Sequence, residues 1–285
     1  MSLAKTPIFL GFYSLIIIGL LSSCASSPTT PEAEAVPQLS PDVIIHTDNG
    51  IIKIQLFDET PLHKANFLRL ARSGFFDSLS FNRIIRDFVI QTGDPRYDNG
   101  GIYPDRPSGP PYTLVPEFRE ELVHTRGMIG AAREPDDKNP DKRSSSSQFY
   151  IVVGKPQSPE ALRMMETEWG IPFRKGKFYE RFQQALSDSS FAGSFTDFLK
   201  EEAYQDFRYP PEQVDLYLNQ GGTPNLDFNY TIFGQVLEGM EVVQEISEIP
   251  TRAEQPMDTV RVLRMEVLTQ AFMARPSPSN STPAQ

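Results

Sequence analysis

The amino-acid sequence predicts a mainly β fold, in which an antiparallel sheet or barrel is capped by two helices and carries a helical insertion. Strand-like apolar segments outnumber helical ones, and the two helices outside the insertion lie far apart, so strand and helix do not alternate. Residues 155–222 differ, because their apolar residues recur at helical spacing between breaks of Pro, Gly and Ser. Hydrophobic residues make up 39% of the 285, which is enough for a substantial core.

The folded part is expected to begin with a hairpin and a helix. Residues 43–47 and 51–57 are apolar-rich runs on either side of Asp48-Asn49-Gly50, whose residue types tolerate the positive φ of a tight turn. A helix follows, with Thr60 as its N-cap, a proline at its first position and Gly74 just beyond its end. Its apolar residues have helical spacing, so we expect one face to pack on the sheet.

Residues 81–92 predict two short strands, 81–85 and 88–92, yet they place Arg83 and Gln91 among apolar side chains. An arginine in such a stretch either faces solvent or points into an apolar binding site, and the stretch alone favours solvent. Residues 97–116 are rich in Gly and Pro and predict a long irregular loop. The other expected elements are strands at 127–132, 148–153, 230–236 and 260–269, a helix at 239–247, and insertion helices at 161–169, 178–186, 195–207 and 212–218.

The first residues have the order of an export signal: one basic residue, an apolar run too short for a membrane span, and then small residues. Leu21-Ser22-Ser23-Cys24 resembles the lipobox of bacterial lipoproteins, in which the cysteine becomes the acylated N-terminus; the alternative is a secretory signal with an incidental cysteine. We expect residues 1–23 to be a lipoprotein signal peptide, Cys24 to be lipidated, and residues 24–41 and 272–285 to be disordered. The anchor would hold the chain in the cell envelope, at the outer membrane and facing the periplasm.

Charge and cysteine content argue against several classes of function. Lys and Arg total 27 against 37 Asp and Glu, and this net charge of −10, without a basic cluster, does not suit nucleic-acid binding. The single cysteine rules out an internal disulfide or a CxxC zinc site. His46, His63 and His124 lie far apart in the sequence and are expected to be surface or sheet residues. We expect no metal, no cofactor and a monomer.

Four segments resemble one family. Residues 81–94 (FNRIIRDFVIQTGD), 126–133 (RGMIGAAR), 146–154 (SSQFYIVVG) and 230–246 (YTIFGQVLEGMEVVQEI) are similar, in this order, to the cyclophilins, which are peptidyl-prolyl cis-trans isomerases. The resemblance implies a cyclophilin-like domain at residues 42–271, interrupted by the helical insertion 155–222. Its implied fold is an eight-stranded antiparallel β-barrel capped by two helices.

The resemblance also implies which residues act on the substrate. Arg83 matches the family's catalytic arginine, and Gln91 matches a glutamine expected to hold the guanidinium in place. The residues implied to bind the substrate are Phe88, Val89, Ala132, Arg133, Gln148, Tyr150, Leu226 and Tyr230. Val89 stands where Met is usual, Tyr150 where Phe is usual, and Asn225 where an aromatic residue often precedes the pocket leucine. These differences predict an altered sequence preference with retained activity.

The implied chemistry follows from the peptide bond before proline. Its cis and trans forms are separated by a barrier of about 18–20 kcal/mol, because amide resonance is broken in the twisted state. An apolar pocket for the proline ring and a fixed guanidinium at the imide nitrogen would bind that twisted state preferentially. The sequence therefore predicts an isomerase acting on proline-containing, unfolded or exported polypeptides. The alternatives are a non-catalytic module that binds such peptides, and a chaperone or scaffold that uses the insertion.

Overall fold

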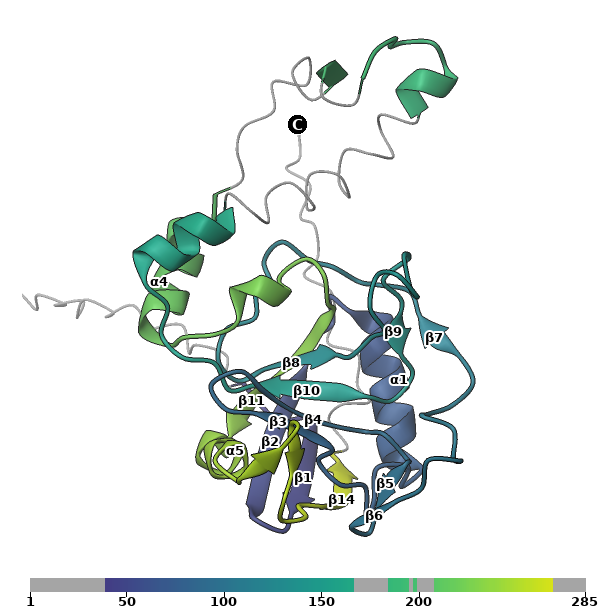
Figure 1. Ribbon diagram of the computed structural model, residues 1–285, viewed down its shortest axis with the longest axis vertical. Helices are drawn as coiled ribbons and strands as arrows, with labels where there is room; N and C mark the ends of the chain where they lie inside the picture. Colours follow the sequence, from purple (N-terminus) through teal and green to yellow (C-terminus); the bar gives the residue numbers. More distant parts are fainter. Residues whose placement is uncertain (1–38, 167–183, 195–196, 199–207, 269–285) are drawn as a thin grey trace, which may run out of the picture. The chain divides into compact units, whose positions relative to one another are not determined.

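The computed structural model describes residues 39–166, 184–194, 197–198 and 208–268. Eight antiparallel strands form one curled sheet in the order β14-β1-β2-β11-β8-β10-β4-β3 (Figure 1). Its strands are β1 (Val43–Thr47), β2 (Gly50–Leu56), β3 (Arg83–Ile85), β4 (Val89–Thr92), β8 (Met128–Ala131), β10 (Phe149–Val152), β11 (Ile232–Glu238) and β14 (Val262–Val267). The mainly β fold expected from the sequence is confirmed.

The two ends of the sheet are joined by the chain next to β3 and β14. The Phe81 N–H donates to the Val260 carbonyl at 2.9 Å, and the Val262 N–H donates to the Leu79 carbonyl at 2.8 Å. Ser80 and Arg261 form a bridge between the same two segments. These backbone bonds curl the sheet toward a barrel, which encloses its apolar face.

Two helices, α1 (Pro61–Arg72) and α5 (Met240–Ser247), cover opposite sides of the curled sheet (Figure 1). Phe67 of α1 packs against Phe76, Phe149 and Phe233, with ring centroids 5.1–5.5 Å away. Val243 and Ile246 of α5 are fully buried. Both helices therefore help to seal the core, as the pattern of their apolar residues predicted.

The first turn of α1 is capped by a residue that is distant in the sequence. Thr60 occupies the N-cap position, as expected, but its side chain makes no capping hydrogen bond. Instead, the Glu117 carboxylate accepts hydrogen bonds from the N–H groups of Leu62 (3.1 Å) and His63 (3.0 Å). The predicted N-cap position is therefore confirmed, but Glu117 takes the capping role of the side chain, because a carboxylate at the helix N-terminus satisfies the free N–H groups and complements the helix dipole.

His63 is neither a surface nor a sheet residue, contrary to expectation; it lies in α1 and is 2% exposed. Its Nδ1 is 2.6 Å from Glu117 Oε2, and its Nε2 is 2.9 Å from Ser144 Oγ. Burial lowers the pKa of His63, and the hydrogen bond and negative charge of Glu117 offset only part of that effect. The folded protein therefore favours the neutral imidazole.

Short elements complete the described fold. Residues 97–116, expected to be an irregular loop, contain three two-residue strands. Two of them, 97–98 and 101–102, pair with each other, and the third, 113–114, pairs with residues 144–145. The short elements are β5 (Tyr97–Asp98), β6 (Gly101–Ile102), β7 (Thr113–Leu114), β9 (Ser144–Ser145), β12 (Thr251–Arg252), β13 (Gln255–Pro256) and η1 (Pro224–Leu226).

The described part of the segment 155–222 contains helical stretches joined by irregular ones. Residues 159–166 and 184–187 are helical, and α4 (Pro211–Asn219) matches the helix expected at 212–218. Most of the helix expected at 195–207 lies outside the described residues, as do the N-terminal residues 1–38 with Cys24, and the tail 272–285. In the part of the chain that the structure describes, no helix is long and apolar enough to cross a membrane.

We expect the substitution His63→Gln to reduce the pH dependence of stability. Below about pH 6.5 the unfolded chain binds a proton at His63 that the folded chain resists, so wild-type stability falls as the pH falls. Gln cannot titrate, so the stability advantage of wild type over the variant should be largest near about pH 7.5 and should narrow by about pH 5.5. Urea unfolding at the two pH values measures this. An equal advantage at both values would contradict the prediction.

Candidate functional site

The pairing of four strands decides which side chains share a face. Arg83 in β3 lies opposite Gln91 in β4, Gln91 lies opposite Tyr150 in β10, and Tyr150 lies opposite Gly130 in β8. The next row consists of four isoleucines, all at most 1% exposed: Ile84, Ile90, Ile151 and Ile129. Because successive side chains point to opposite faces, the isoleucines fill the core while the first row faces outward.

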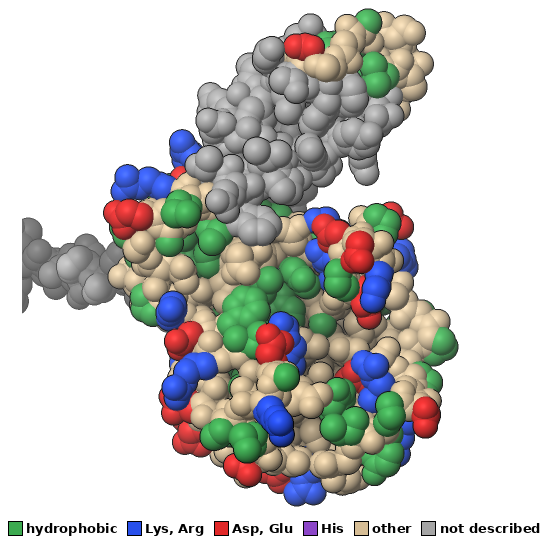
Figure 2. Space-filling model, viewed as in Figure 1, with side chains coloured by type: hydrophobic (Ala, Val, Ile, Leu, Met, Phe, Trp, Pro, Cys, Tyr) green, Lys and Arg blue, Asp and Glu red, His purple; other side chains and the backbone are tan. Residues whose placement is uncertain are grey.

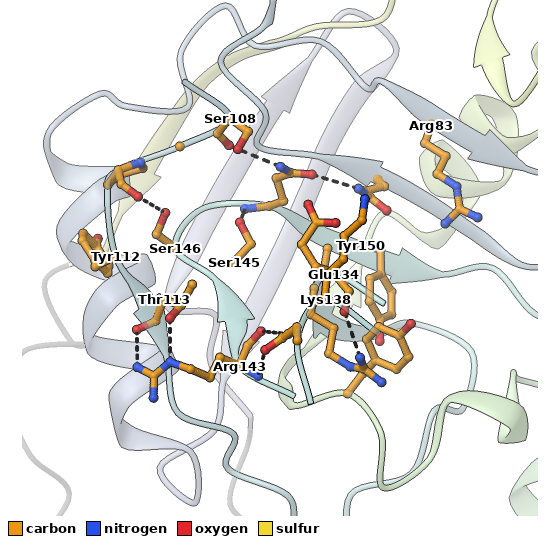
Figure 3. A pocket seen from close by; sticks show the side chains of 18 of the residues that line it. Arg83, Ser108, Tyr112, Thr113, Glu134, Lys138, Arg143, Ser145, Ser146 and Tyr150 are labelled. Carbon is orange, nitrogen blue, oxygen red and sulfur yellow. Dashed lines mark hydrogen bonds between the residues drawn. The ribbon is translucent and has the colours of Figure 1, made fainter. Parts of the chain in front are cut away.

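A cavity of about 1130 Å³ opens on the outward face of these strands (Figure 3). Figure 2 shows hydrophobic side chains gathered around a hollow in the middle of this face, with charged side chains around them. All ten residues that the sequence implicated line the cavity, namely Arg83, Phe88, Val89, Gln91, Ala132, Arg133, Gln148, Tyr150, Leu226 and Tyr230. The fold therefore brings together residues from four separate parts of the chain.

The floor of the cavity is apolar. Val89, Ala132, Tyr150 and Leu226 form a buried cluster, and Phe88 and Tyr230 pack against it. The Tyr150 ring lies across Gly130, where a Cβ atom would approach the ring to 2.4 Å. Any side chain at Gly130 would therefore displace the Tyr150 ring.

Arg83 is held by a partner that the sequence did not indicate. Its Nε lies 2.6 Å from Glu254 Oε2, and the two side chains are 39% and 52% exposed. Among the described residues, Glu254 is the only hydrogen-bond partner of this guanidinium. Ala253 and Glu254 both have positive φ in the turn between β12 and β13, and the Ile84 N–H donates to the Glu254 carbonyl at 2.7 Å. The hairpin is thus fixed beside β3.

Gln91 does not hold the guanidinium, so this expectation is wrong. Its Nε2 instead donates to Gln148 Oε1 at 3.2 Å, and Gln148 Nε2 donates to the Ser108 carbonyl at 3.3 Å. The two glutamines meet because β4 and β10 are direct neighbours, whereas the Arg83 side chain extends toward the β12–β13 hairpin. These hydrogen bonds connect the two glutamines to Ser108, whose place beside the cavity is labelled in Figure 3.

Ala132 and Arg133 form one wall of the cavity, and hydrogen bonds hold both residues in place. The Ala132 N–H donates to the Gln148 carbonyl at 3.0 Å, and the Ala132 carbonyl accepts from the Ser145 N–H at 2.8 Å. The Ala132 N–H is therefore not available to bind a peptide strand. Arg133 donates through Nε to the Asn229 carbonyl at 2.8 Å, and its guanidinium carbon lies 4.6 Å from the centre of the Tyr230 ring.

The hydroxyl of Tyr150 is bound to a buried histidine. His124 is fully buried, which contradicts the expectation of a surface or sheet residue, and its Nε2 lies 2.9 Å from the Tyr150 oxygen. His124 Nδ1 lies 2.8 Å from Asp227 Oδ1. Burial raises the pKa of Tyr150 well above that of a free phenol, with further increases from Tyr230 and from the negative charge of Asp227. Tyr150 is therefore protonated across the physiological pH range.

Two loops that sequence reasoning did not assign to the site also line the cavity. Residues 107–113 and 134–143 contribute Ser108, Tyr112, Glu134, Lys138 and Arg143, among others. Arg143 ties the loops together, with its Nε 2.6 Å from Thr113 Oγ1. Their proline-rich and charged sequences, PSGPP and EPDDKNPDKR, are signals that could have marked them as ordered loops beside the site. Among the described residues, no group of three or more His, Cys, Asp or Glu could hold a metal ion.

Comparison with known proteins places these features in a family. Residues 42–166 and 211–267, which are more than half of the chain, match the family model "Cyclophilin type peptidyl-prolyl cis-trans isomerase/CLD". Residues 167–210 have no counterpart in that match. The matched segments include all ten cavity residues that the sequence implicated, whose individual roles stay predictions.

Two relatives and one solved structure are similar to this chain. A Staphylococcus epidermidis protein whose name places it among the peptidyl-prolyl cis-trans isomerases is 26% identical over 216 residues, which are 74% of this chain and 83% of the relative. A Streptococcus pyogenes protein, named for a phosphatase and an isomerase, is 29% identical over 244 residues; the match covers 83% of this chain but 41% of the relative. A Cryptosporidium parvum cyclophilin, solved in the presence of the dipeptide Ala-Pro, is 21% identical with a TM-score of 0.48, covering 80% of this chain and 98% of that one.

We expect Tyr150 to remain protonated in alkaline solution until the protein unfolds, because its pKa is raised well above the usual value near 10. The ultraviolet absorbance of phenolate measures this in wild type and in Tyr150→Phe. The two native proteins should give the same absorbance change up to about pH 11, and the variant should lack one tyrosine only after unfolding. A smaller native change in the variant would show that Tyr150 ionises in the folded protein.

Proposed function

The chain belongs to the family of cyclophilin-type peptidyl-prolyl cis-trans isomerases, and we propose that it catalyses cis-trans rotation of the bond before proline in unfolded or exported polypeptides. The observation that carries this proposal is a guanidinium, Arg83, beside an apolar floor made by Val89, Tyr150 and Leu226 in one cavity. No other chemistry is required, because rotation breaks no covalent bond.

The apolar floor would receive the proline ring. Burial of the ring against Tyr150 and Leu226 fixes the position of the imide bond relative to the rest of the cavity. The peptide on either side of the proline would lie along the polar wall, where Gln91 and Gln148 form one hydrogen-bonded chain. Holding both sides of the bond keeps the twisted geometry in place while one side rotates.

Arg83 would stabilise the twisted state. When the bond twists, the imide nitrogen regains a lone pair, and a guanidinium can donate to it and to the proline carbonyl. Glu254 occupies Nε, so the two terminal nitrogens of Arg83 remain to meet the substrate. A fixed guanidinium helps because its donors do not have to reorganise as the charge develops.

The substitution Arg83→Ala should lower kcat/KM by about 100-fold to 1000-fold, the usual cost of removing one donor that stabilises a transition state. Isomerisation of an Ala-Pro-Phe peptide, followed in wild type and variant, measures the effect. Arg86→Ala is the matched control, since Arg86 is an exposed arginine three residues along the chain that does not line the cavity. Its activity should equal that of wild type.

Two outcomes would contradict the enzyme proposal. Wild type that isomerises the peptide no faster than buffer would leave the non-catalytic, proline-binding module as the better description. Arg83→Ala with full activity would show that the guanidinium does not stabilise the twisted state.

We also propose that Cys24 carries a lipid that anchors the protein in the cell envelope, with the site facing the periplasm. The support is sequence alone, namely an apolar run followed by Leu21-Ser22-Ser23-Cys24 with the only cysteine of the chain. In a bacterial host fed radioactive palmitate, wild type should be labelled and Cys24→Ala should not. Label that survives Cys24→Ala would overturn the proposal, and Ser23→Ala serves as the control that keeps the cysteine.

A further inference from the structure

Asp227 is a buried carboxylate that accepts four hydrogen bonds; its side chain is 1% exposed. Its Oδ1 accepts from the His124 N–H at 2.7 Å and from His124 Nδ1 at 2.8 Å. Its Oδ2 accepts from the hydroxyls of Tyr209 at 2.8 Å and Tyr217 at 2.6 Å. A buried carboxylate is tolerated only when its oxygens are satisfied in this way.

The donors onto Asp227 also set the direction of the next hydrogen bond. An ionised carboxylate only accepts, so Nδ1 of His124 carries a proton, and in the neutral ring Nε2 is an acceptor. The Tyr150 hydroxyl, 2.9 Å away, then donates to Nε2. Donation therefore runs from Tyr150 to His124 and from His124 to Asp227, and Tyr217 donates to the other oxygen of the same carboxylate. Asp227 thus links Tyr217 to the Tyr150 ring at the floor of the cavity.

The two ends of this link belong to different parts of the protein. Tyr217 is in α4, which lies just after the unmatched residues 167–210, and it is fully buried against Val123, Leu162 and Tyr209. Tyr150 is in β10 of the barrel. The segment 155–222 and the barrel also meet at the segment's C-terminal end, where the Arg126 N–H donates to the Gly221 carbonyl at 3.0 Å.

The chain of hydrogen bonds explains why a tyrosine stands at the floor. A phenylalanine there would fill the same apolar space but would leave His124 Nε2 buried without its partner. The hydroxyl fixes the direction of the ring axis over Gly130, because the phenol oxygen lies on that axis and cannot swing away without losing its bond to His124. The position of the floor therefore depends on residues outside the cavity.

We propose that α4 is part of the proline site and that Tyr217 is a positioning residue, which sets the affinity for proline-containing peptides by orienting Tyr150 through Asp227 and His124. The inference rests on the proposed function for the identity of the ligand. In this proposal the affinity of the barrel for peptide depends on α4. An insertion that acts alone as a chaperone or scaffold would leave that affinity unchanged.

The test is a double-mutant cycle between Tyr217→Phe and Tyr150→Phe in the full chain. The dissociation constant for an Ala-Pro-Phe peptide, measured by calorimetry, should rise about threefold to tenfold for Tyr217→Phe alone, as expected when a buried carboxylate loses a donor. In the Tyr150→Phe background, the same change should alter the dissociation constant less than about twofold, because the link to the floor is already cut. In kinetics, KM should change and kcat should not, since Arg83 is untouched.

Controls separate positioning from general damage to the fold. Tyr97→Phe removes a hydroxyl that accepts from Gln255 Nε2 outside the cavity, and it should leave peptide binding unchanged. If Tyr217→Phe does not fold, Tyr209→Phe removes the other hydroxyl from the same oxygen and should weaken binding in the same way. The inference would be overturned if Tyr217→Phe raised the dissociation constant by the same factor in both backgrounds, or changed it in neither.

The failure of the proposed function would look different. Wild type that binds the peptide without isomerising it would remove the enzyme proposal, while the binding cycle would still decide the role of Tyr217. Wild type that does not bind the peptide would overturn both.

Discussion

The register of β3, β4, β10 and β8 determines the chemistry of both faces of the sheet. One row across these strands holds four buried isoleucines, and the adjacent row holds Arg83, Gln91, Tyr150 and Gly130. A shift of one residue in any pairing would move isoleucine to the cavity and a polar group into the core. The large cost of such an exchange protects the register, so the stability of the core also keeps the site in place.

The alternation of apolar and polar residues explains how much could be predicted from the sequence. Strands, both capping helices and α4 are short-range patterns, and their boundaries agree with the structure within a few residues. Arg83 and Gln91 were ambiguous on their own, because the same alternation fits a solvent-facing arginine. Only their co-occurrence with three other family-like segments indicated that they belong to a site, and the fold does bring these segments to one cavity.

The partners of these residues were not predictable, because each lies far along the chain. Glu117 is 54 residues from His63, Glu254 is 171 from Arg83, and Asp227 is 103 from His124. No local periodicity relates such pairs, and many surface carboxylates in this acidic chain have the same local context. Both errors about histidines have this origin, since a lone histidine in a sequence shows nothing about the carboxylate that will face it.

Three carboxylates each bind a residue that is distant in the sequence, and the three differ in burial. Asp227 and Glu117 are 1% and 8% exposed at their side chains, whereas Glu254 is 52% exposed. Removing a donor from a buried carboxylate leaves an unpaired charge, so the bonds to Asp227 and Glu117 persist as fixed parts of the fold. The half-exposed pair of Arg83 and Glu254 costs at most about 1 kcal/mol to break. The pair therefore orients the guanidinium while adding little to the stability of the fold, which depends on the buried carboxylates instead. Under the proposed function, a guanidinium oriented in advance beside a rigid floor is what preferential binding of a transient geometry demands.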